Sequence, residues 1–438
     1  MTEQPSPSLA EQTGDAMQFV ADVRNIDTPN PQRRQLADPV AAATLFKDET
    51  VSRIESILNA QSGTPVILLS GGVDSILVAA AAVKLGVRPH AITVIANGGT
   101  DRENAVAAAD ALGLTHEIID LSEDTVVDLA REAVNRLGLP ELWEVSYAIP
   151  LLATLPVLDR IGTTGPILTG SGADAIVGGG KVLGHPIDSP QAIEELDLII
   201  RKESANNFVH DRLVPDFYPR VMGKYADQFV HVFQTLRFWE VAETFAPPAL
   251  FGNRDGNPVD KFAVRIACEM LLPETSKNLA WAKKSAIQRS AGIMGTLATA
   301  SRTFAASLPG AQTYSDPMTE PYEAVATRLF LALLDGTSQH QRYSTSGGEK
   351  AITETDPVTD FVAHYHLDIG GNWNSHRENW QQVALDAWLQ AAQQRNLDAT
   401  VLYLCEDSNQ DVAIIEVGQN RYAITHLGRA AEVRAERR

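Results

Sequence analysis

The chain has 438 residues, 44% of them hydrophobic, and a formal net charge of −19 at pH 7. This length and composition predict two or three globular domains. The acidic charge disfavours a tRNA or DNA partner, because phosphate contacts dominate nucleic-acid affinity. The two cysteines, Cys268 and Cys405, form no CxxC pair, so neither zinc nor dithiol chemistry is expected and a reducing cytoplasm fits. We expect no signal peptide and no segment near the roughly 18 apolar residues of a membrane span.

The elements expected along the chain describe an α/β protein. Residues 1–40 are polar and proline-containing, which predicts a partly disordered arm. Residues 41–310 begin with a helix and then alternate apolar strands with helices. The strands are expected at 65–69, 90–96, 116–121 and 166–170. This alternation predicts a parallel sheet with helices on both faces, followed by a helical second half. Long helices are expected there, one of them at 225–245 and another at 281–308.

The C-terminal part is expected to hold a helix and linker at 311–357 and a small α+β appendage of unknown role at 358–438. Strands are expected at 359–369, 399–405, 411–417 and 421–427, with a helix at 377–396. The first of these strands places His364, His366 and Asp368 on one face, because side chains alternate along a strand. A polar strand face is the preferred interpretation, with a metal site as the alternative.

The stretch "SGGVDS", Ser70 to Ser75, follows the first predicted strand and precedes a helix. Gly71 and Gly72 allow close backbone approach and positive φ, and amide groups at the helix start converge on an anion. Ser70 and Ser75 add hydroxyl groups. Asp74 would repel phosphates unless Mg²⁺ lies between them, because Mg²⁺ prefers one or two carboxylates plus phosphate oxygens. The alternative is a tight turn in which Asp74 caps the helix.

The SGGxDS string resembles the pyrophosphate loop of the N-type ATP pyrophosphatases. The resemblance implies an adenine nucleotide α-hydrolase-like fold with a five-stranded parallel sheet, and cleavage of ATP to AMP and pyrophosphate. In that group the adenine is held by backbone at the end of the second strand, which here corresponds to Thr93, Val94 and Ile95.

A second turn, "LTGSGADAIVGGG" at 168–180, is similar to the signature of the asparagine synthetases. Gly170, Gly172 and Asp174 match in register, which implies that Asp174 is the second Mg²⁺ carboxylate. Ser171 stands where asparagine synthetases carry Glu and β-lactam synthetases carry Tyr. That position lies near the reacting carbon, and serine is a poor general base at neutral pH. The alternative is a glycine-rich helix start packed under the sheet.

Two more residues follow from weaker parts of the resemblance. Glu243, in "AETFAPPALFG", matches a family glutamate that could orient or deprotonate the amine, and a helix-surface glutamate is the alternative. Lys284 matches a family lysine that contacts pyrophosphate, although Lys283 would take its place if the register slips by one. A solvated helix lysine is the alternative.

The sequence therefore predicts an ATP- and Mg²⁺-dependent ligase of the asparagine synthetase and β-lactam synthetase type. It would adenylate a small-molecule carboxylate and transfer the acyl group to ammonia or an amine, in a specialised biosynthetic pathway. No glutaminase domain is expected, so nitrogen would come from free ammonia, an amine or a separate ammonia-supplying subunit; homo-oligomerisation is open. The alternatives are an NAD-synthetase-like or tRNA-modifying pyrophosphatase and a non-catalytic nucleotide-binding protein.

Overall fold

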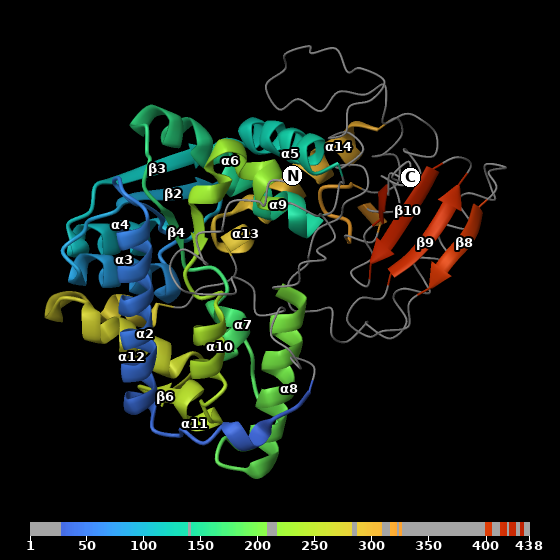
Figure 1. Cartoon of the computed structure of the whole chain (residues 1–438). Coiled ribbons are helices and arrows are strands. Elements are labelled where there is room, and N and C mark those ends of the chain that lie inside the picture. Colours follow the sequence, from blue (N-terminus) through green and yellow to red (C-terminus); the bar gives the residue numbers. More distant parts are fainter. Residues whose placement is uncertain are drawn as a thin grey trace, which may run out of the picture. The chain divides into compact units, whose positions relative to one another are not determined.

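The structure is a computed structural model in which residues 28–138, 142–207, 217–282, 287–308, 316–321, 324–325, 399–404, 412–417, 420–425 and 430–432 are described (Figure 1). These residues group into two compact units. The first comprises the described parts of Met1–Val94, Thr100–Ile119 and Thr154–Ala286. The second comprises those of Ile95–Gly99, Asp120–Ala153 and Ile287–Arg438.

A five-stranded parallel sheet with helices organises the fold, as the sequence predicts. Its strands, in sheet order, are β3 (His116–Leu121), β2 (His90–Ala96), β1 (Val66–Leu68), β4 (Ile167–Thr169) and β5 (Phe229–His231). The register places Val66 of β1 opposite His90 of β2 and opposite Ile167 of β4. Since the strand order reverses between β1 and β4, the sheet has its topological switch point there, where open α/β sheets bind ligands.

Strand β5 corrects one expectation. The spacing of apolar residues in 225–245 predicts a single helix, but the structure has η3 (Gly223–Gln228), β5 and α10 (Leu236–Ala242). The short run Phe229–Phe233 has no helical or strand periodicity of its own, and parallel pairing with β4 decides its conformation. The helix expected at 281–308 is likewise divided: α14 (Ile293–Ser307) begins after Gly292, whose φ of 81° interrupts a helix.

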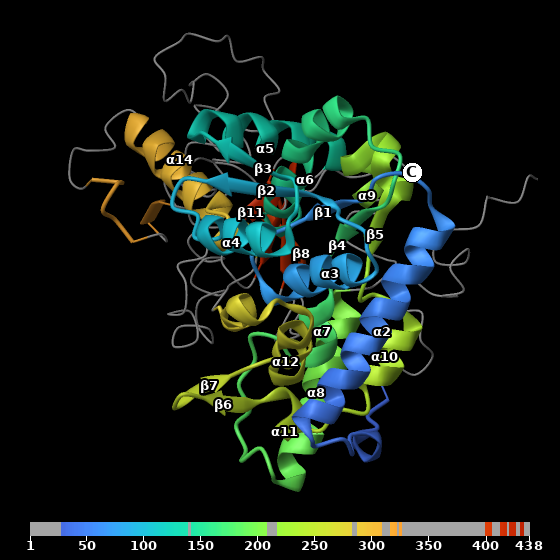
Figure 2. The same ribbon diagram turned by 90° about the vertical axis from the view of Figure 1, so that its left-hand side faces the viewer.

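Three helices form a layer beside the sheet in the first unit. Helix α3 (Val73–Lys84) packs on β1 and β4, and α2 (Pro39–Ala60) and α12 (Phe262–Leu271) pack on α3 and on each other (Figure 2). Helix α2 starts at Pro39 because the Asp38 side chain accepts hydrogen bonds from the amides of Val40 and Ala41. Small alanines on α3 permit this close packing, and four of them in succession, Ala79 to Ala82, are buried.

An aromatic cluster joins α2 to the helical second half of the first unit. The Phe46 ring lies 5.5 Å from Phe233, 5.3 Å from Phe238 and 6.4 Å from Phe245, measured between centroids. All four rings are fully buried. The remaining elements of the first unit are η2 (Pro31–Arg33), α4 (Arg102–Leu112), α7 (Ala173–Val177), α8 (Pro190–Asn207), α9 (Phe217–Met222), α11 (Pro247–Leu250), β6 (Gly252–Arg254), β7 (Asn257–Val259) and η4 (Glu274–Trp281).

The second unit contains α5 (Glu123–Leu137), part of α6 (Leu142–Ile161), α13 (Ile287–Ser290) and α14. Its C-terminal sheet is antiparallel, in the order β11 (Ala430–Glu432), β10 (Asn420–Thr425), β9 (Val412–Val417) and β8 (Ala399–Leu404). Strands are therefore present at three of the expected positions, and β11 is additional. The expected strand at 359–369, with its three candidate metal ligands, and the expected helix at 377–396 lie outside the described residues.

One described helix, α6, is long and apolar enough to cross a membrane, so the expectation that no segment would reach that length is wrong. Within this protein, however, 67% of its most apolar window is buried. A buried core helix passes the same test of length and composition.

Candidate active site

The two glycine turns lie side by side at the switch point of the sheet. Strands β1 and β4 pair in parallel, with Ile67 opposite Leu168, so the residues that follow them leave the sheet at the same edge. Gly170 shows how close the turns are. A Cβ atom on this residue would lie 2.6 Å from the Ser75 nitrogen and 2.7 Å from the Asp74 carbonyl carbon. Only glycine permits this approach of one backbone to the other.

Local geometry fixes the first turn at the start of α3. Gly71 has a φ of 71°, and a Cβ atom there would lie 2.9 Å from Asp101 O and from Ala105 N. The Asn104 side-chain amide donates a hydrogen bond to Gly71 O. Gly72 is the N-cap of α3, so the amide groups of the first helical turn are left for an anion.

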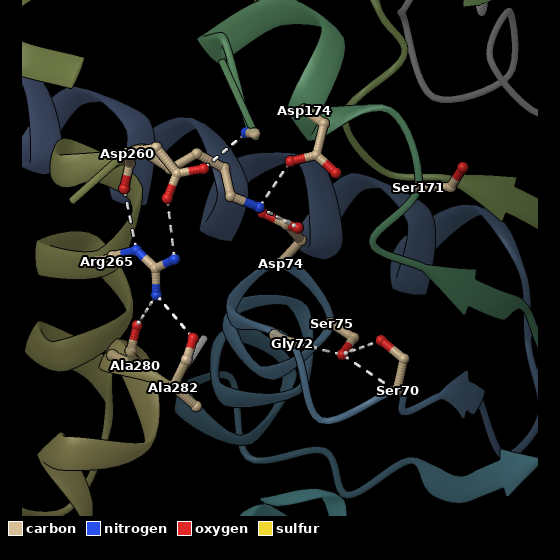
Figure 3. A network of polar contacts seen from close by, with 12 residues as sticks. Ser70, Gly72, Asp74, Ser75, Ser171, Asp174, Asp260, Arg265, Ala280 and Ala282 are labelled. Carbon is tan, nitrogen blue, oxygen red and sulfur yellow. Dashed lines mark hydrogen bonds and ion pairs between the residues drawn. The ribbon is translucent and has the colours of Figure 1, made fainter. Parts of the chain in front are cut away.

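The two serines of this turn face each other (Figure 3). Ser75 Oγ donates to Gly72 O at 3.0 Å and accepts from the Ser70 amide at 3.2 Å. The two hydroxyl oxygens are also 3.2 Å apart. The turn thus gathers both hydroxyls beside the N-terminus of a twelve-residue helix.

The second turn places Asp174 and Ser171 differently. Gly172, with a φ of 97°, is the N-cap of α7, and Asp174 lies in the first turn of that helix. A Cβ atom on Gly179 would lie 1.8 Å from Asp174 Oδ1, so a side chain there would displace the carboxylate. Ser171 donates its amide to Thr169 Oγ1 at 3.1 Å. Figure 3 shows its side chain pointing away from the Asp74 and Asp174 carboxylates.

A lysine that the sequence analysis did not single out joins the two predicted metal ligands. Lys261 Nζ lies 2.8 Å from Asp74 Oδ2 and 2.7 Å from Asp174 Oδ1. The lysine side chain is 9% exposed, against 17% for Asp74 and 62% for Asp174. Burial alone would lower the pKa of this ammonium group, but the two carboxylate charges and their hydrogen bonds outweigh burial and raise its pKa well above the ordinary value.

Neighbouring contacts hold Lys261 in place. Asp260 accepts a hydrogen bond from the Gly180 amide at 2.6 Å and forms an ion pair with Arg265 at 3.1 Å. Arg265 also donates to the carbonyls of Ala280 and Ala282 (Figure 3). Burial raises the pKa of the Asp260 carboxyl, but the Gly180 amide and the charges of Lys261 and Arg265 outweigh it and lower that pKa below the usual range.

Two local irregularities mark Lys261 in hindsight. It is the N-cap of α12, and its backbone is left-handed, with φ 51° and ψ 37°. A non-glycine residue in that region is strained, and a cation at a helix N-terminus opposes the helix dipole. From the sequence alone, a lysine directly before the apolar periodic stretch 262–271 breaks the normal pattern of a helix start, which is the available signal.

The predicted adenine contacts lie at the end of β2. Thr93 is buried, and its hydroxyl donates to Leu69 O at 2.5 Å and contacts His116 Nε2 at 2.8 Å. It therefore ties β2 to the start of the first glycine turn. Val94 and Ile95 are also buried, so these three residues can offer a ligand their backbone but little side-chain surface. Their role in holding adenine stays a prediction.

Of the remaining candidates, the structure places Glu243 in a different cluster. Glu243 is buried and held by Arg201 at 2.5 Å and by Arg33 at 3.1 Å. These partners belong to a different ion cluster from that of Lys261, and the role of Glu243 as a base stays a prediction. Lys283 and Lys284 lie outside the described residues.

The carboxylate pair fits a magnesium ion. A single cation, the Lys261 ammonium, already touches both aspartates, so one metal ion can do the same. No group of three or more His, Cys, Asp or Glu residues is placed to hold a metal among the described residues. Two carboxylates and no protein cage are what Mg²⁺ uses when phosphate oxygens complete its coordination.

The geometry thus defines an α/β protein with two glycine turns side by side at the switch point of its sheet, and comparison with known proteins adds a family resemblance. Residues 60–243 match the model of the asparagine synthase family, a family of ATP-dependent synthetases. This confirms the resemblance over a segment that contains both glycine turns and Glu243 and that covers under half of the chain. Lys261 lies beyond it. No curated protein sequence matches the chain.

Among solved structures, the chain is similar to NMN synthetase from Francisella tularensis. The two share 16% sequence identity with a TM-score of 0.26, over 46% of this chain and 92% of that one.

Proposed function

We propose that this protein is an ATP-dependent C–N ligase. It adenylates a small-molecule carboxylate, releases pyrophosphate and transfers the acyl group to ammonia or an amine. The observation that carries the proposal is the convergence of Asp74 and Asp174, from two glycine turns, on one cation at the switch point of a parallel sheet. The match of residues 60–243 to the asparagine synthase family supports it.

Donor groups and carboxylates of the site have different proposed roles. The amides at the start of α3, with the Ser70 and Ser75 hydroxyls, bind phosphate oxygens, because a helix N-terminus favours anions. Asp74 and Asp174 would hold Mg²⁺, which would supply positive charge to neutralise the charge that develops on pyrophosphate. Lys284, if it follows the family pattern, contacts the same leaving group.

Both chemical steps conserve atoms without another reagent. A carboxylate oxygen of the substrate attacks the α-phosphorus of ATP, and the bond to pyrophosphate breaks. The amine nitrogen then attacks the acyl carbon, AMP leaves, and the nitrogen loses a proton. Ser171 lies in the second turn and faces away from the metal ligands, which suits a residue on the side of the acyl acceptor. Glu243 is the candidate that the family pattern offers as base.

The test is release of pyrophosphate and AMP from Mg-ATP with a panel of carboxylates and amines. The ligase proposal expects both products in equal amounts, dependent on a carboxylate, and a new amide detected by mass spectrometry. Amidation of a dinucleotide substrate would instead support an NAD-synthetase-like enzyme, and pyrophosphate release only with tRNA would support an RNA-modifying one. Absence of turnover with every panel, together with retained ATP binding, would support a non-catalytic protein.

The finer parts of the proposal concern the setting. We place the enzyme in the cytoplasm, because its two cysteines form no CxxC pair, and in a specialised biosynthetic pathway. Cys268 is buried, and burial raises the pKa of its thiol, so it suits a packing role rather than nucleophilic chemistry. Ammonia, an amine or a separate ammonia-supplying subunit would provide nitrogen. Gel filtration with light scattering would show whether the enzyme is a homo-oligomer.

A further inference from the structure

We propose that Lys261 is an internal counter-ion that occupies the magnesium position until nucleotide binds. Its ammonium group holds Asp74 and Asp174 together in the empty site, and Mg²⁺ enters only with ATP, by displacing it. The inference rests on the proposed function for the assignment of the two aspartates as metal ligands. It adds a positioning residue that lies outside the segment matched to the family.

Geometry is the first support. The ammonium nitrogen lies within 2.8 Å of both carboxylates, one from each glycine turn. Two carboxylates this close repel each other unless a cation lies between them. An ammonium group buried to this degree also needs charged partners, since an unpaired buried charge is strongly disfavoured. Lysine and aspartates therefore stabilise one another before any ligand arrives.

The backbone gives independent support. Lys261 pays a conformational penalty for its left-handed φ of 51° and lies at a helix end that disfavours cations. Strain of this kind persists where surrounding contacts impose it, and it concentrates at functional sites. Here the Asp260 contacts with Gly180 and Arg265 impose it. The turn thus directs a flexible side chain toward the two aspartates.

Charge explains why the metal displaces the lysine only with nucleotide. One ammonium group leaves the aspartate pair with an excess negative charge, whereas a divalent cation balances both carboxylates. Mg²⁺ loses its water reluctantly and needs phosphate oxygens to complete its shell. Without ATP the metal competes poorly with a tethered ammonium group. With ATP the added phosphate ligands shift the competition toward the metal, so metal and nucleotide bind cooperatively.

The test uses Mn²⁺ as a magnesium probe, with free Mn²⁺ measured by electron paramagnetic resonance on the full chain. The wild type should bind Mn²⁺ weakly without nucleotide and more tightly with ATP. In Lys261→Met the nucleotide-free affinity should rise by about tenfold or more, because the competing charge is gone. Lys261→Arg should keep the wild-type behaviour, since it retains a cation. Lys277→Met, which removes a lysine from an exposed pair with Glu274, is the matched control and should change nothing.

Two results would overturn the inference. The first is tight nucleotide-free Mn²⁺ binding by the wild type, a measurement that requires no variant and so stands even if Lys261→Met does not fold. The second is a folded Lys261→Met protein that binds Mn²⁺ alone no better than the wild type. Both readouts are binding measurements. They can therefore fail while pyrophosphate release succeeds, or succeed while no substrate is turned over, which separates this inference from the proposed function.

Discussion

Two ion clusters in the first unit, each built around a buried cation, carry opposite net charge. Around Lys261, one ammonium group faces the two carboxylates of Asp74 and Asp174. Around α8, three guanidinium groups face two carboxylates. The α8 cluster consists of Arg33, Arg34, Asp197, Arg201 and Glu243, joined by ion pairs of 2.5–3.1 Å. The first cluster has an excess of negative charge, and the second has an excess of positive charge.

This difference indicates what each cluster can do. An excess of carboxylate at the edge of a sheet, with Asp174 62% exposed, can accept a divalent cation from solvent. In the α8 cluster, Arg34 and Asp197 are fully buried, and burial lowers the pKa of the Arg34 guanidinium although Asp197 opposes that effect. Each acidic oxygen there already meets a guanidinium group or the Asn30 amide. That arrangement fastens the segment 30–36 to α8 and α10.

The variant with the largest expected effect on activity is Asp174→Asn, which tests whether the Lys261 cluster binds a metal ion. Lys261 keeps its ion pair with Asp74, and the Asp174 side chain is mostly exposed, so we expect the free energy of unfolding to fall by only about 1–2 kcal/mol. Loss of a metal ligand should reduce pyrophosphate release by about 100-fold or more. Asp128→Asn, in an exposed pair with Arg131, is the control for removal of a surface carboxylate. Wild-type turnover in Asp174→Asn would refute the metal assignment.

The reciprocal change is Asp197→Asn. It leaves the buried Arg34 and Arg201 without their shared counter-charge, which should lower the free energy of unfolding by about 3–5 kcal/mol. Urea unfolding followed by circular dichroism measures this loss. Glu132→Gln, which removes an exposed helix pair with Arg136, should cost less than about 0.5 kcal/mol. A similar cost for both variants would show that the α8 cluster contributes no more than surface ion pairs.

Glu243→Gln distinguishes a structural glutamate from a catalytic base. With two guanidinium partners, Glu243 should contribute about 1–3 kcal/mol to folding, and its amide replacement should change kcat/KM by less than about threefold. Both quantities come from the same purified variant. A loss of kcat/KM of about 100-fold or more, with stability unchanged, would instead support the role that the family pattern gives it.

The smallest expected effect concerns acid stability through Asp260. Its pKa is lowered in the folded protein, so the unfolded state binds more protons as the pH falls below the ordinary carboxyl value of about 3.9. The stabilisation is therefore present at neutral pH and disappears as the pH falls through the lowered folded pKa. Melting temperatures of wild type and Asp260→Asn should differ at pH 7 and converge as the pH falls below about 4. Curves that stay parallel would refute this contribution.

Features of the fold that depend on short segments could be predicted from the sequence. The strands before the glycine turns are apolar runs, and the turns need glycine for reasons visible within a few residues. Gly71 must adopt positive φ, and Gly170 must let two backbones meet. The fifth strand was missed because its apolar run has no period of its own and depends on β4 for its conformation.

The partners of the site residues could not be read from the sequence, because they depend on the tertiary fold. Lys261 and Asp74 are 187 residues apart. Arg34 belongs to a polar arm that composition marks as partly disordered, yet its side chain is fully buried against Asp197 from α8. Only the tertiary fold shows that Glu243 lies within reach of Arg33 and Arg201, and a family pattern does not include those contacts.

The crowding at Gly170 has a consequence for how such an enzyme diversifies. Gly170 cannot carry a side chain without pushing the two turns apart, and Gly172 holds a left-handed backbone that disfavours other residues. Between them, Ser171 is half-exposed and its side chain points away from the metal ligands. Of this tripeptide, the middle residue can therefore be exchanged without disturbing the two turns on either side. Under the proposed function, substitution of Ser171 alone would be enough to change the acyl acceptor.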